Sequence, residues 1–373
     1  MAGPAQQQQL IEAFEARYQS TPDVARAPGR VNLIGEHTDY NLGYVLPIAI
    51  DLACYVGCAP NRDGVLRVYS ENLQQSRQWP VEHIAELKAC GDWTDYVIGI
   101  ARQLPLGRGR DLLIHSTVPL GSGLSSSASL EVAVALALGW SGELPSLELV
   151  KLARRAENEF IELPSGIMDQ YAAVFGRRDA ALKIDCRSLE CECVELPAGA
   201  AIVAVNSMVR HELAQSAYRQ RVEECAQAAR EIRKSLRDAT LDDLPFIHDP
   251  TALRRARHII TENQRVLDFV AASRRGDLAQ MGRLLVASHR SLQTDYEVSC
   301  DELDFLVDMA FSVPGVFGAR MTGGGFGGCT VNFVEPGAVD RFQETIGRAY
   351  RERFEIDPVF YSVKPSEGAS RIS

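Results

Sequence analysis

The chain has 373 residues, a length that predicts two domains and can bury a large core without metals or disulfide bonds. Its 39 basic and 49 acidic residues give a formal net charge of −10, which argues against a general binder of nucleic acid or of anionic membranes. Nine cysteines, an odd number without zinc-ribbon spacing, favour buried free thiols in a reducing compartment.

No part of the sequence is typical of export or of membrane insertion. The first ten residues lack the basic and apolar regions of a signal peptide. The longest apolar run, residues 132–140, is too short to span a bilayer. We therefore expect a cytoplasmic protein with no membrane partner.

Strand and helix patterns alternate through the first two hundred residues. Turn residues at 61–64 predict a hairpin between the strands that flank them. The glutamine-rich start is expected to fray before the first helix. The predicted elements are, in chain order, a helix over 10–18, strands over 31–34, 44–50, 52–59 and 64–69, a helix over 93–104, a strand over 111–117, helices over 130–138 and 147–160, and strands over 180–185 and 194–196.

The remaining residues follow a similar mixture, which predicts an α+β architecture in both halves. A linker at 197–200 places the boundary between an N-terminal domain of residues 1–200 and a C-terminal domain of residues 201–373. The predicted elements are a strand over 201–206, a mostly helical stretch over 215–290, a helix over 302–310, strands over 316–321 and 329–334, a helix over 339–350 and a strand over 359–363.

The first segment that carries chemistry is residues 27–41, where Glu36, His37 and Asp39 crowd into four positions after an apolar strand. A metal site could use these three residue types as ligands. A sugar site could use the same carboxylates to accept hydrogen bonds from hydroxyl groups, and a solvated turn is the structural alternative. Arg30, just upstream, could balance the carboxylates or face a phosphate.

The second segment is the glycine- and serine-rich stretch 119–129, which leads from a strand into a buried helix. Glycines let backbone N–H groups point inward, and the helix N-terminus adds partial positive charge, so the segment suits a phosphate group. It is not a Walker A loop, because the dipeptide Gly-Lys is absent from the sequence. The G-x-S-x-G nucleophile elbow is also missing. A simple cap on the helix is the structural alternative.

The third segment, residues 321–330, contains a formal G-x-G-x-x-G pattern. A dinucleotide site needs a helix directly after such a pattern, whereas here an alternating strand pattern follows. We therefore expect a strand–glycine loop–strand whose bare backbone approaches another loop or a ligand, with a flexible hairpin as the alternative.

Two acidic residues lie between the second and third segments. Asp169 follows Gly166 in an apolar stretch, and a buried carboxylate needs a partner or a chemical role. A capping role is its structural alternative. Glu157, near the end of an amphipathic helix, is by itself typical of a solvated helix face.

Taken together and in this order, the three segments resemble the GHMP small-molecule kinases, and residues 29–41 resemble the galactokinase signature. Residues 165–170, 184–189, 206–211 and 288–300 are also similar to galactokinases. The resemblance implies two α+β domains, the first like ribosomal protein S5 and the second ferredoxin-like, with the active site between them. It implies transfer of the γ-phosphoryl group of ATP to the C1 hydroxyl of α-D-galactose. The sequence does not fix the oligomeric state, and a monomer is expected.

The same resemblance implies roles for individual residues. Arg30 and Asp169 would flank the C1 hydroxyl, and Ser127 with Glu157 would hold Mg²⁺. The sugar contacts implied are Glu36, His37, Asp39, Gly166 and Tyr218. The backbone implied to hold the triphosphate belongs to Gly121, Ser122, Gly123, Leu124, Ser125, Ser126 and Ser127. The adenine pocket implied is lined by Trp93 and Tyr96.

Phosphoryl transfer depends on positioning and charge neutralisation. The glycine-, serine- and charge-rich segments can supply both, so their residues agree with a kinase. Asp169 would accept the proton of the sugar hydroxyl or orient that hydroxyl, and both roles stay open. The alternatives are an N-acetylgalactosamine kinase, a catalytically silent sensor of galactose and ATP, and a metal-dependent hydrolase built on the first segment. Thr38 and Asn41 fit the galactose type, and the complete serine loop argues against the sensor.

Overall fold

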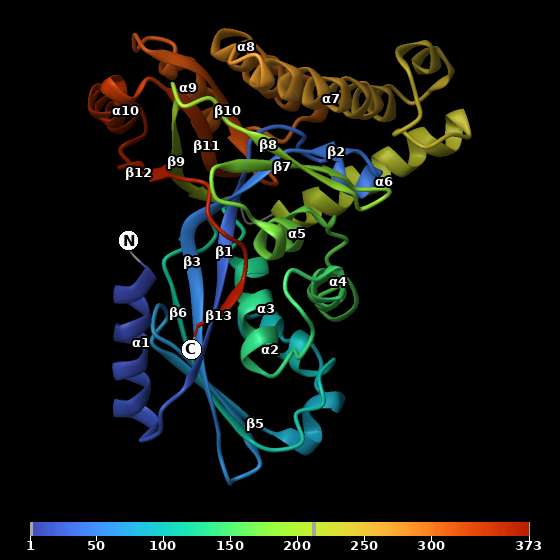
Figure 1. Cartoon of the computed structure of the whole chain (residues 1–373). Coiled ribbons are helices and arrows are strands. Elements are labelled where there is room, and N and C mark those ends of the chain that lie inside the picture. The colour runs from blue at the N-terminus through green and yellow to red at the C-terminus, as the bar shows by residue number, and fades with distance from the viewer. Residues whose placement is uncertain (1–2, 211–213, 373) are drawn as a thin grey trace.

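The computed structural model describes residues 3–210 and 214–372. The lower half in Figure 1 is built on a six-stranded sheet with the strand order β13-β1-β3-β6-β4-β5. Its strands are β1 (Asp23–Asn32), β3 (Pro47–Pro60), β4 (Val65–Ser70), β5 (Gln75–Pro80), β6 (Arg110–Ser116) and β13 (Ser370–Ile372).

Helices cover both faces of this sheet because its central strands alternate between two cores. Ala53 and Tyr55 of β3 pack towards α1 (Gly3–Tyr18), whereas Cys54 and Val56 pack towards the opposite helices. Figure 1 shows α1 on one side of the sheet and the other helices on its far side. The elements on that far side are α2 (Thr94–Ala101), α3 (Ser126–Ala137), α4 (Leu147–Arg155) and α5 (Met168–Phe175).

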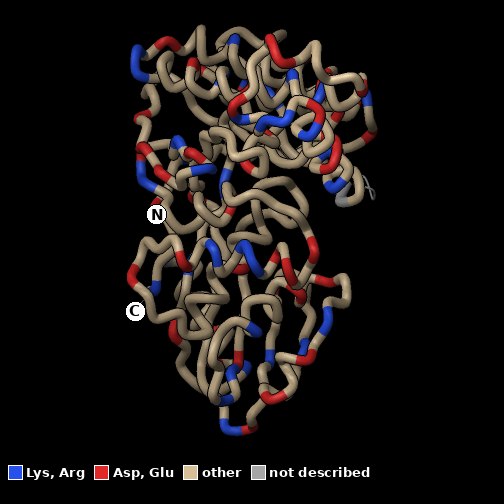
Figure 2. The backbone as a smooth tube through the Cα atoms, turned by 90° about the vertical axis from the view of Figure 1, so that its right-hand side faces the viewer, with Lys and Arg blue, Asp and Glu red and all other residues tan. Residues whose placement is uncertain are grey.

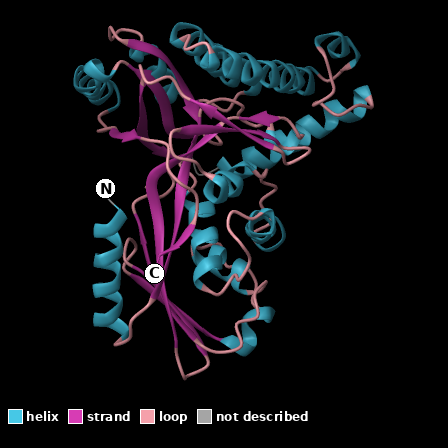
Figure 3. Cartoon of the chain, in the orientation of Figure 1, coloured by secondary structure: helices cyan, strands magenta, loops and turns pink. Residues whose placement is uncertain are grey.

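The upper half contains a four-stranded sheet with the order β10-β11-β9-β12. Ile202 and Ala204 of β9 pack into one core, and Val203 and Val205 pack into the core on the other face. The strands are β9 (Ala201–Arg210), β10 (Val316–Thr322), β11 (Gly327–Val334) and β12 (Val359–Val363), and the helices of this half are α6 (Ala214–Ile232), α7 (Pro250–Arg274), α8 (Leu278–Ser291), α9 (Asp301–Ala310) and α10 (Val339–Phe354). Figure 3 shows this mixture of helices and strands in both halves, which confirms the predicted α+β class.

A small third sheet, β2 (Tyr44–Val45), β7 (Ala180–Asp185) and β8 (Cys191–Glu195), lies where the two halves meet. Beside it, helix α7 holds the segment from Gly35 to Tyr44. The Gly35 N–H donates to Glu262 (2.9 Å), and the Tyr44 N–H donates to Asn263 (2.8 Å). A segment from the first half is therefore fixed by side chains of the second.

The two glycine-rich segments meet backbone to backbone. Gly323, whose φ is +88°, is so close to Gly123 that an added Cβ would lie 2.9 Å from the Gly123 carbonyl oxygen. Gly328 approaches the Ser122 carbonyl oxygen in the same way. The prediction of a strand–loop–strand that approaches another loop is thus confirmed, and a side chain at Gly323 would be strained in this conformation.

A buried ion pair lies beneath this meeting point. Arg320 of β10 is fully buried, and its Nη2 lies 3.1 Å from Oε1 of Glu36. Its Nη1 donates to the carbonyl oxygens of Asn32 and Leu33 at the end of β1 (3.2 and 2.9 Å). The ion pair therefore joins the segment 27–41 of the first half, which contains Glu36, to the four-stranded sheet of the second half.

Several predictions about the elements were wrong. Helix α1 begins at Gly3 and does not fray, because glutamine is a good helix former and Leu10 and Phe14 dock onto the sheet. Residues 47–60 form one strand, since Asp51 pairs its backbone and carboxylate with Lys364 and does not end the strand. The turn at 61–64 is not a hairpin between paired strands, because β6 lies between β3 and β4.

Two edge strands were not predicted. The residues of β5 are polar and mostly exposed, so their pattern resembles a loop. Strand β13, at the end of the chain, pairs with β1, so the closing residues return to the sheet of the first half. The boundary at residue 200 stays a prediction, although β9 begins at Ala201.

Charged residues of both signs are distributed over both halves of the molecule. Figure 2 shows basic and acidic residues interspersed along both halves. Among the described residues, none of the helices is long and apolar enough to cross a membrane.

We predict that Arg320→Met lowers the free energy of unfolding by about 3–5 kcal/mol, because it leaves the carboxylate of Glu36 buried without its cation. The matched control is Arg351→Met. Arg351 lies on the exposed surface of α10, and the loss of its exposed ion pair with Asp357 should change stability little. Chemical denaturation of both variants measures the difference. Equal stability of the two variants would contradict the structural role assigned to Arg320.

Candidate active site

Two adjoining cavities lie between the halves. One, of about 240 Å³, contains the charged residues of the first motif, and the other, of about 640 Å³, contains the serine loop. Both volumes are in or near the range of small-molecule sites. The residues common to both cavities are Arg30, Tyr96, Ser127, Asp169, Gly324, Gly325 and Phe326.

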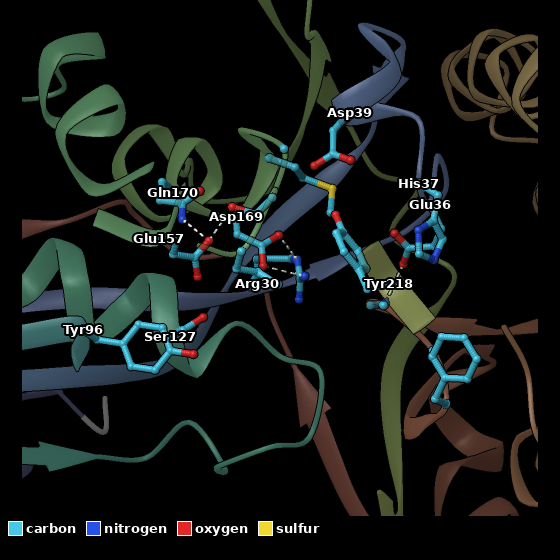
Figure 4. Close-up of a pocket in the computed structure, with 18 residues that line it drawn as sticks. Arg30, Glu36, His37, Asp39, Tyr96, Ser127, Glu157, Asp169, Gln170 and Tyr218 are labelled. Atoms are coloured by element: carbon cyan, nitrogen blue, oxygen red, sulfur yellow. Dashed lines mark hydrogen bonds and ion pairs between the residues drawn. The ribbon is translucent and has the colours of Figure 1, made fainter. Parts of the chain in front are cut away.

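Arg30 and Asp169 form the centre of this common wall (Figure 4). The Arg30 guanidinium donates to both carboxylate oxygens of Asp169, from Nε at 2.9 Å and from Nη2 at 2.7 Å. Its Nη1 donates to the Gly123 carbonyl oxygen at 2.6 Å. The hydroxyl of Ser125 also donates to Asp169. A bidentate pair of this kind fixes both position and orientation of the carboxylate.

The serine loop faces the larger cavity through selected residues. Gly121, Gly123, Ser125, Ser126 and Ser127 line the cavity, and helix α3 begins at Ser126. Its N-terminus is thus directed at the cavity, as an anion site requires.

Two predicted members of the loop turn their side chains away from the cavity. The hydroxyl of Ser122 donates to the Pro119 carbonyl (2.8 Å), and Leu124 is fully buried in the core. These two residues can therefore serve a ligand through their backbone alone.

A carboxylate lies beside Ser127 in the lining of the smaller cavity. Glu157 is 4% exposed and accepts hydrogen bonds from Ser165 (2.6 Å) and Gln170 (3.0 Å). Burial raises the pKa of Glu157, and the negative charge of Asp169 adds to that effect. Glu157 is thus not the solvated helix residue that its isolated pattern suggested.

Gln170 connects Glu157 to another buried acid. Its Nε2 also donates to Glu131 (3.1 Å), which is fully buried on α3. Burial and the charge of Glu157 raise the pKa of Glu131 well above its usual value. Carboxylates are therefore concentrated behind the wall that Arg30 and Asp169 form.

The smaller cavity brings together all the residues predicted to contact a sugar. Asp39 lies against Gly166, where an added Cβ would meet the Asp39 carboxylate oxygen at 1.8 Å. No larger residue fits at Gly166 unless Asp39 moves. Burial, reinforced by the charge of Asp169, raises the pKa of Asp39 to about 6. The other predicted residues on this lining are Glu36, His37 and Tyr218.

Glu36 and His37 are held by different partners. Glu36 accepts from Asn32 (2.6 Å) and from the Gly323 N–H (2.6 Å), besides its ion pair with Arg320. Burial lowers the pKa of His37 to about 3, so its ring is neutral near pH 7. Because Glu36 has these partners, part of its role is to hold the two halves together.

The larger cavity has aromatic side chains in its lining. Trp93 and Tyr96 both line it, Tyr96 at the wall shared with the smaller cavity, and the Trp93 indole donates to Gln75 on β5 (2.9 Å). The apolar residues Leu73, Leu130 and Ile161 also line this cavity. Such a surface suits a flat aromatic ring.

Sequence reasoning assigned no role to Arg320 or Gln170, although both are at the site. Arg320 is a charged residue within an apolar strand pattern, and that exception was the available signal. Gln170 directly follows Asp169, but nothing in the pattern indicated which acids it would bridge.

Comparison with known proteins agrees with this geometry. Family models match the galactokinase galactose-binding signature at residues 12–60, the GHMP kinase N-terminal domain at 95–177 and the GHMP kinase C-terminal domain at 269–352. The solved structure of Lactococcus lactis galactokinase complexed with galactose has a TM-score of 0.93 and 35% identity, covering 98% of this chain and 100% of that chain. The Methanococcus jannaschii mevalonate kinase shares the fold, with a TM-score of 0.69 at 20% identity, over 94% of this chain and 100% of that chain.

Curated relatives extend the likeness over nearly the whole chain. A galactokinase of Roseiflexus sp. (strain RS-1) is 44% identical over 98% of this chain and 97% of that protein. A galactokinase of Thermotoga maritima is 42% identical over 93% of this chain and 99% of that protein. The chain therefore belongs to the galactokinase family, the ATP-dependent sugar kinases among the GHMP kinases.

Proposed function

We propose that the protein transfers the γ-phosphoryl group of ATP to the C1 hydroxyl of α-D-galactose, giving galactose 1-phosphate and ADP. The observation that carries the proposal is the wall of Arg30, Asp169 and Ser127, which faces both cavities at once. A sugar on one side and a triphosphate on the other would meet there. The galactose bound to the Lactococcus lactis relative supports the choice of sugar.

Asp169 and Arg30 perform the transfer in this proposal. Asp169 accepts the proton of the C1 hydroxyl or orients that hydroxyl towards the phosphate. Arg30 fixes the carboxylate with two hydrogen bonds and places positive charge where the transition state is negative. The enzyme mainly positions the reactants, because phosphoryl transfer requires little covalent chemistry from the protein.

The residues around Glu157 fit a magnesium ion. Ser127 and Glu157 offer oxygen ligands, and the buried Glu157 forms no ion pair with any basic side chain in the described chain. When bound, Mg²⁺ would neutralise charge on the β- and γ-phosphates. Ser165 and Gln170 would hold the Glu157 carboxylate in place.

The remaining contacts follow the two cavities. Asp39, Glu36, His37, Gly166 and Tyr218 would bind the sugar. The backbone of residues 121–127 and the α3 N-terminus would bind the triphosphate, and Trp93 and Tyr96 would flank the adenine. A cytoplasmic location and a monomeric state stay predictions, and all nine cysteines are free thiols in the structure.

A coupled ADP-release assay tests the function with galactose, N-acetylgalactosamine, glucose or no sugar. We expect turnover with galactose and little with glucose, since a reversed C4 hydroxyl leaves a buried acceptor unfilled. Faster turnover with N-acetylgalactosamine than with galactose would favour the alternative of an N-acetylgalactosamine kinase. Binding of galactose and ATP without ADP release would favour a sensor.

We predict that Asp169→Asn binds galactose but loses about 10²–10⁴-fold in turnover, because the amide keeps the shape and removes the basic carboxylate. Asp340→Asn, on the exposed start of α10, is the matched control and should keep full activity. Steady-state kinetics and calorimetry on both variants separate rate from binding. More than a tenth of wild-type turnover in Asp169→Asn would refute its role.

Ser127→Ala combined with Glu157→Gln is expected to raise the Mg²⁺ concentration needed for half-maximal activity, with little change in galactose affinity. The reason is the loss of both proposed protein ligands. The control is Glu148→Gln, which replaces an exposed acidic residue of α4, the helix that directly precedes Glu157. A Mg²⁺ titration that matches wild type would show that these residues do not hold the ion.

The pKa of Asp39, raised to about 6, predicts a pH dependence of sugar affinity. Above pH 6 the carboxylate is ionised and accepts from a sugar hydroxyl, whereas below pH 6 it is protonated. The galactose Kd should therefore rise as the pH falls below 6, by up to about tenfold per pH unit. Calorimetry from pH 5 to 8 measures this, and Asp39→Asn should bind weakly with a flat profile. An equally steep profile in Asp39→Asn would assign the effect to another group.

A further inference from the structure

Ser125 has an unusual conformation for the residue that precedes a helix. Its backbone has a φ of +62° and a ψ of +46°, the left-handed region that residues other than glycine seldom adopt. Its carbonyl oxygen still accepts from the Ser129 N–H (3.1 Å), as in a regular first turn of α3. A serine at this position usually has an extended backbone, and its side chain accepts from an N–H group of that turn.

The Ser125 side chain makes no such capping hydrogen bond. Its hydroxyl instead donates to Oδ2 of Asp169, at the start of α5. The direction of this hydrogen bond follows from the chemistry of the groups. The carboxylate faces the guanidinium of Arg30, which carries donors only, so both carboxylate oxygens are acceptors. The left-handed backbone thus directs the hydroxyl away from its own helix and towards the acid.

The donors around Asp169 are distributed unequally over its two oxygens, which together offer about four acceptor positions. Oδ2 accepts from Nη2 of Arg30 (2.7 Å) and from Ser125, so both of its positions are filled. Oδ1 accepts from Nε of Arg30 (2.9 Å), and among the described residues no second donor reaches it. Because Asp169 lines both cavities, the position left for a ligand hydroxyl is on Oδ1.

The same arrangement leaves the first turn of α3 available for an anion. The N–H groups of Ser126, Ser127 and Ala128 precede the Ser129 N–H, and none of them is capped by the Ser125 hydroxyl. Ser126 and Ser127 line the larger cavity. A backbone held in a sparsely populated conformation is often found at functional sites, where the surrounding structure maintains it. Here one side chain leaves the helix end free and contacts the acid beside it.

We propose that Ser125 is a positioning residue that holds the Asp169 carboxylate so that Oδ1 receives the C1 hydroxyl of the sugar. The Ser125 hydroxyl occupies the second acceptor position on Oδ2, which would otherwise compete with Oδ1 for the substrate. This inference rests on the proposed function, since it assumes phosphoryl transfer at C1. Ser125 thereby connects the loop that would hold the triphosphate to the acid that would hold the sugar.

The central test is Ser125→Gly, which removes the hydroxyl and keeps the left-handed backbone, because glycine adopts that conformation freely. We expect kcat with galactose to fall about tenfold, with the KM values for galactose and ATP within about twofold of wild type, since one hydrogen bond to a charged group is lost while the loop backbone stays in place. If Ser125 only shaped the loop, glycine would keep the wild-type kcat. That result would overturn the proposal.

Ser125→Ala separates the hydroxyl from the backbone conformation. It also removes the hydroxyl, and alanine does not readily adopt a left-handed backbone once the hydrogen bond to Asp169 is gone. We expect a similar loss in kcat together with a higher KM for ATP. The matched controls are Glu355→Gly and Glu355→Ala, because Glu355 is exposed and ends α10 in the same left-handed conformation (φ +59°). Both controls should keep wild-type kinetics, and a wild-type kcat in Ser125→Ala would contradict the proposal.

A double-mutant cycle tests whether Ser125 acts through Asp169. In the Asp169→Asn background, Ser125→Gly should cause no further loss in kcat, because the carboxylate that Ser125 positions is already absent. A merely structural contribution of Ser125 would lower kcat equally in both backgrounds. An undiminished effect in the Asp169→Asn background would therefore overturn the proposal.

A crystal structure with galactose tests which oxygen is used. We expect the C1 hydroxyl on Oδ1, the oxygen that accepts from Nε of Arg30, and a C1 hydroxyl on Oδ2 would overturn the proposal. The kinetic assay distinguishes the two levels of inference. A wild type that does not phosphorylate galactose would refute the proposed function and this inference with it. An active wild type beside an equally active Ser125→Gly would refute this inference alone.

Discussion

The arrangement of the site depends on the hydrogen bonds that the Arg30 guanidinium donates. Its two hydrogen bonds to Asp169 fix the start of α5, and its third, to the Gly123 carbonyl, fixes the serine loop. The backbone N–H of Arg30 donates to Leu124 in the same loop (3.1 Å). One residue at the end of β1 therefore sets the distance between the carboxylate of one cavity and the anion-binding backbone of the other.

The electrostatics of the site follow from burying more acids than bases. Asp39, Glu131 and Glu157 all have a raised pKa, each chiefly because of burial. Among the described residues that line the larger cavity, Arg30 is the basic side chain, and no lysine stands where a P-loop kinase has one. Binding a triphosphate here thus relies on backbone N–H groups, a helix N-terminus and a cation held by oxygen ligands.

The sequence predicted most of the site because its chemistry is concentrated in short motifs. The structure brings Arg30, Asp39, Asp169 and Ser127 into the lining of two adjoining cavities, and the roles of these residues stay predictions. Single-residue patterns were less informative. Glu157 resembled a solvated helix position, and its burial depends on Ser165 and Gln170, which no helical period reveals.

Long-range pairing was the part that the sequence could not supply. The partners Glu36 and Arg320 are 284 positions apart, so neither pattern names the other. Strand β13 is three residues long and is specified by pairing with β1 at the opposite end of the chain. The turn at 61–64 has the correct residues for a hairpin, yet β6 takes the place beside β3. Local propensity describes the turn, and tertiary pairing decides which strands it joins.

The most direct measurement is a crystal structure with galactose, Mg²⁺ and a non-hydrolysable ATP analogue bound together. The account predicts the C1 hydroxyl oxygen within hydrogen-bond reach of Asp169, at roughly 2.6–3.2 Å, with the γ-phosphate between Arg30 and Ser127. A sugar whose C1 hydroxyl points away from Asp169, or a triphosphate bound outside the 121–127 loop, would contradict it.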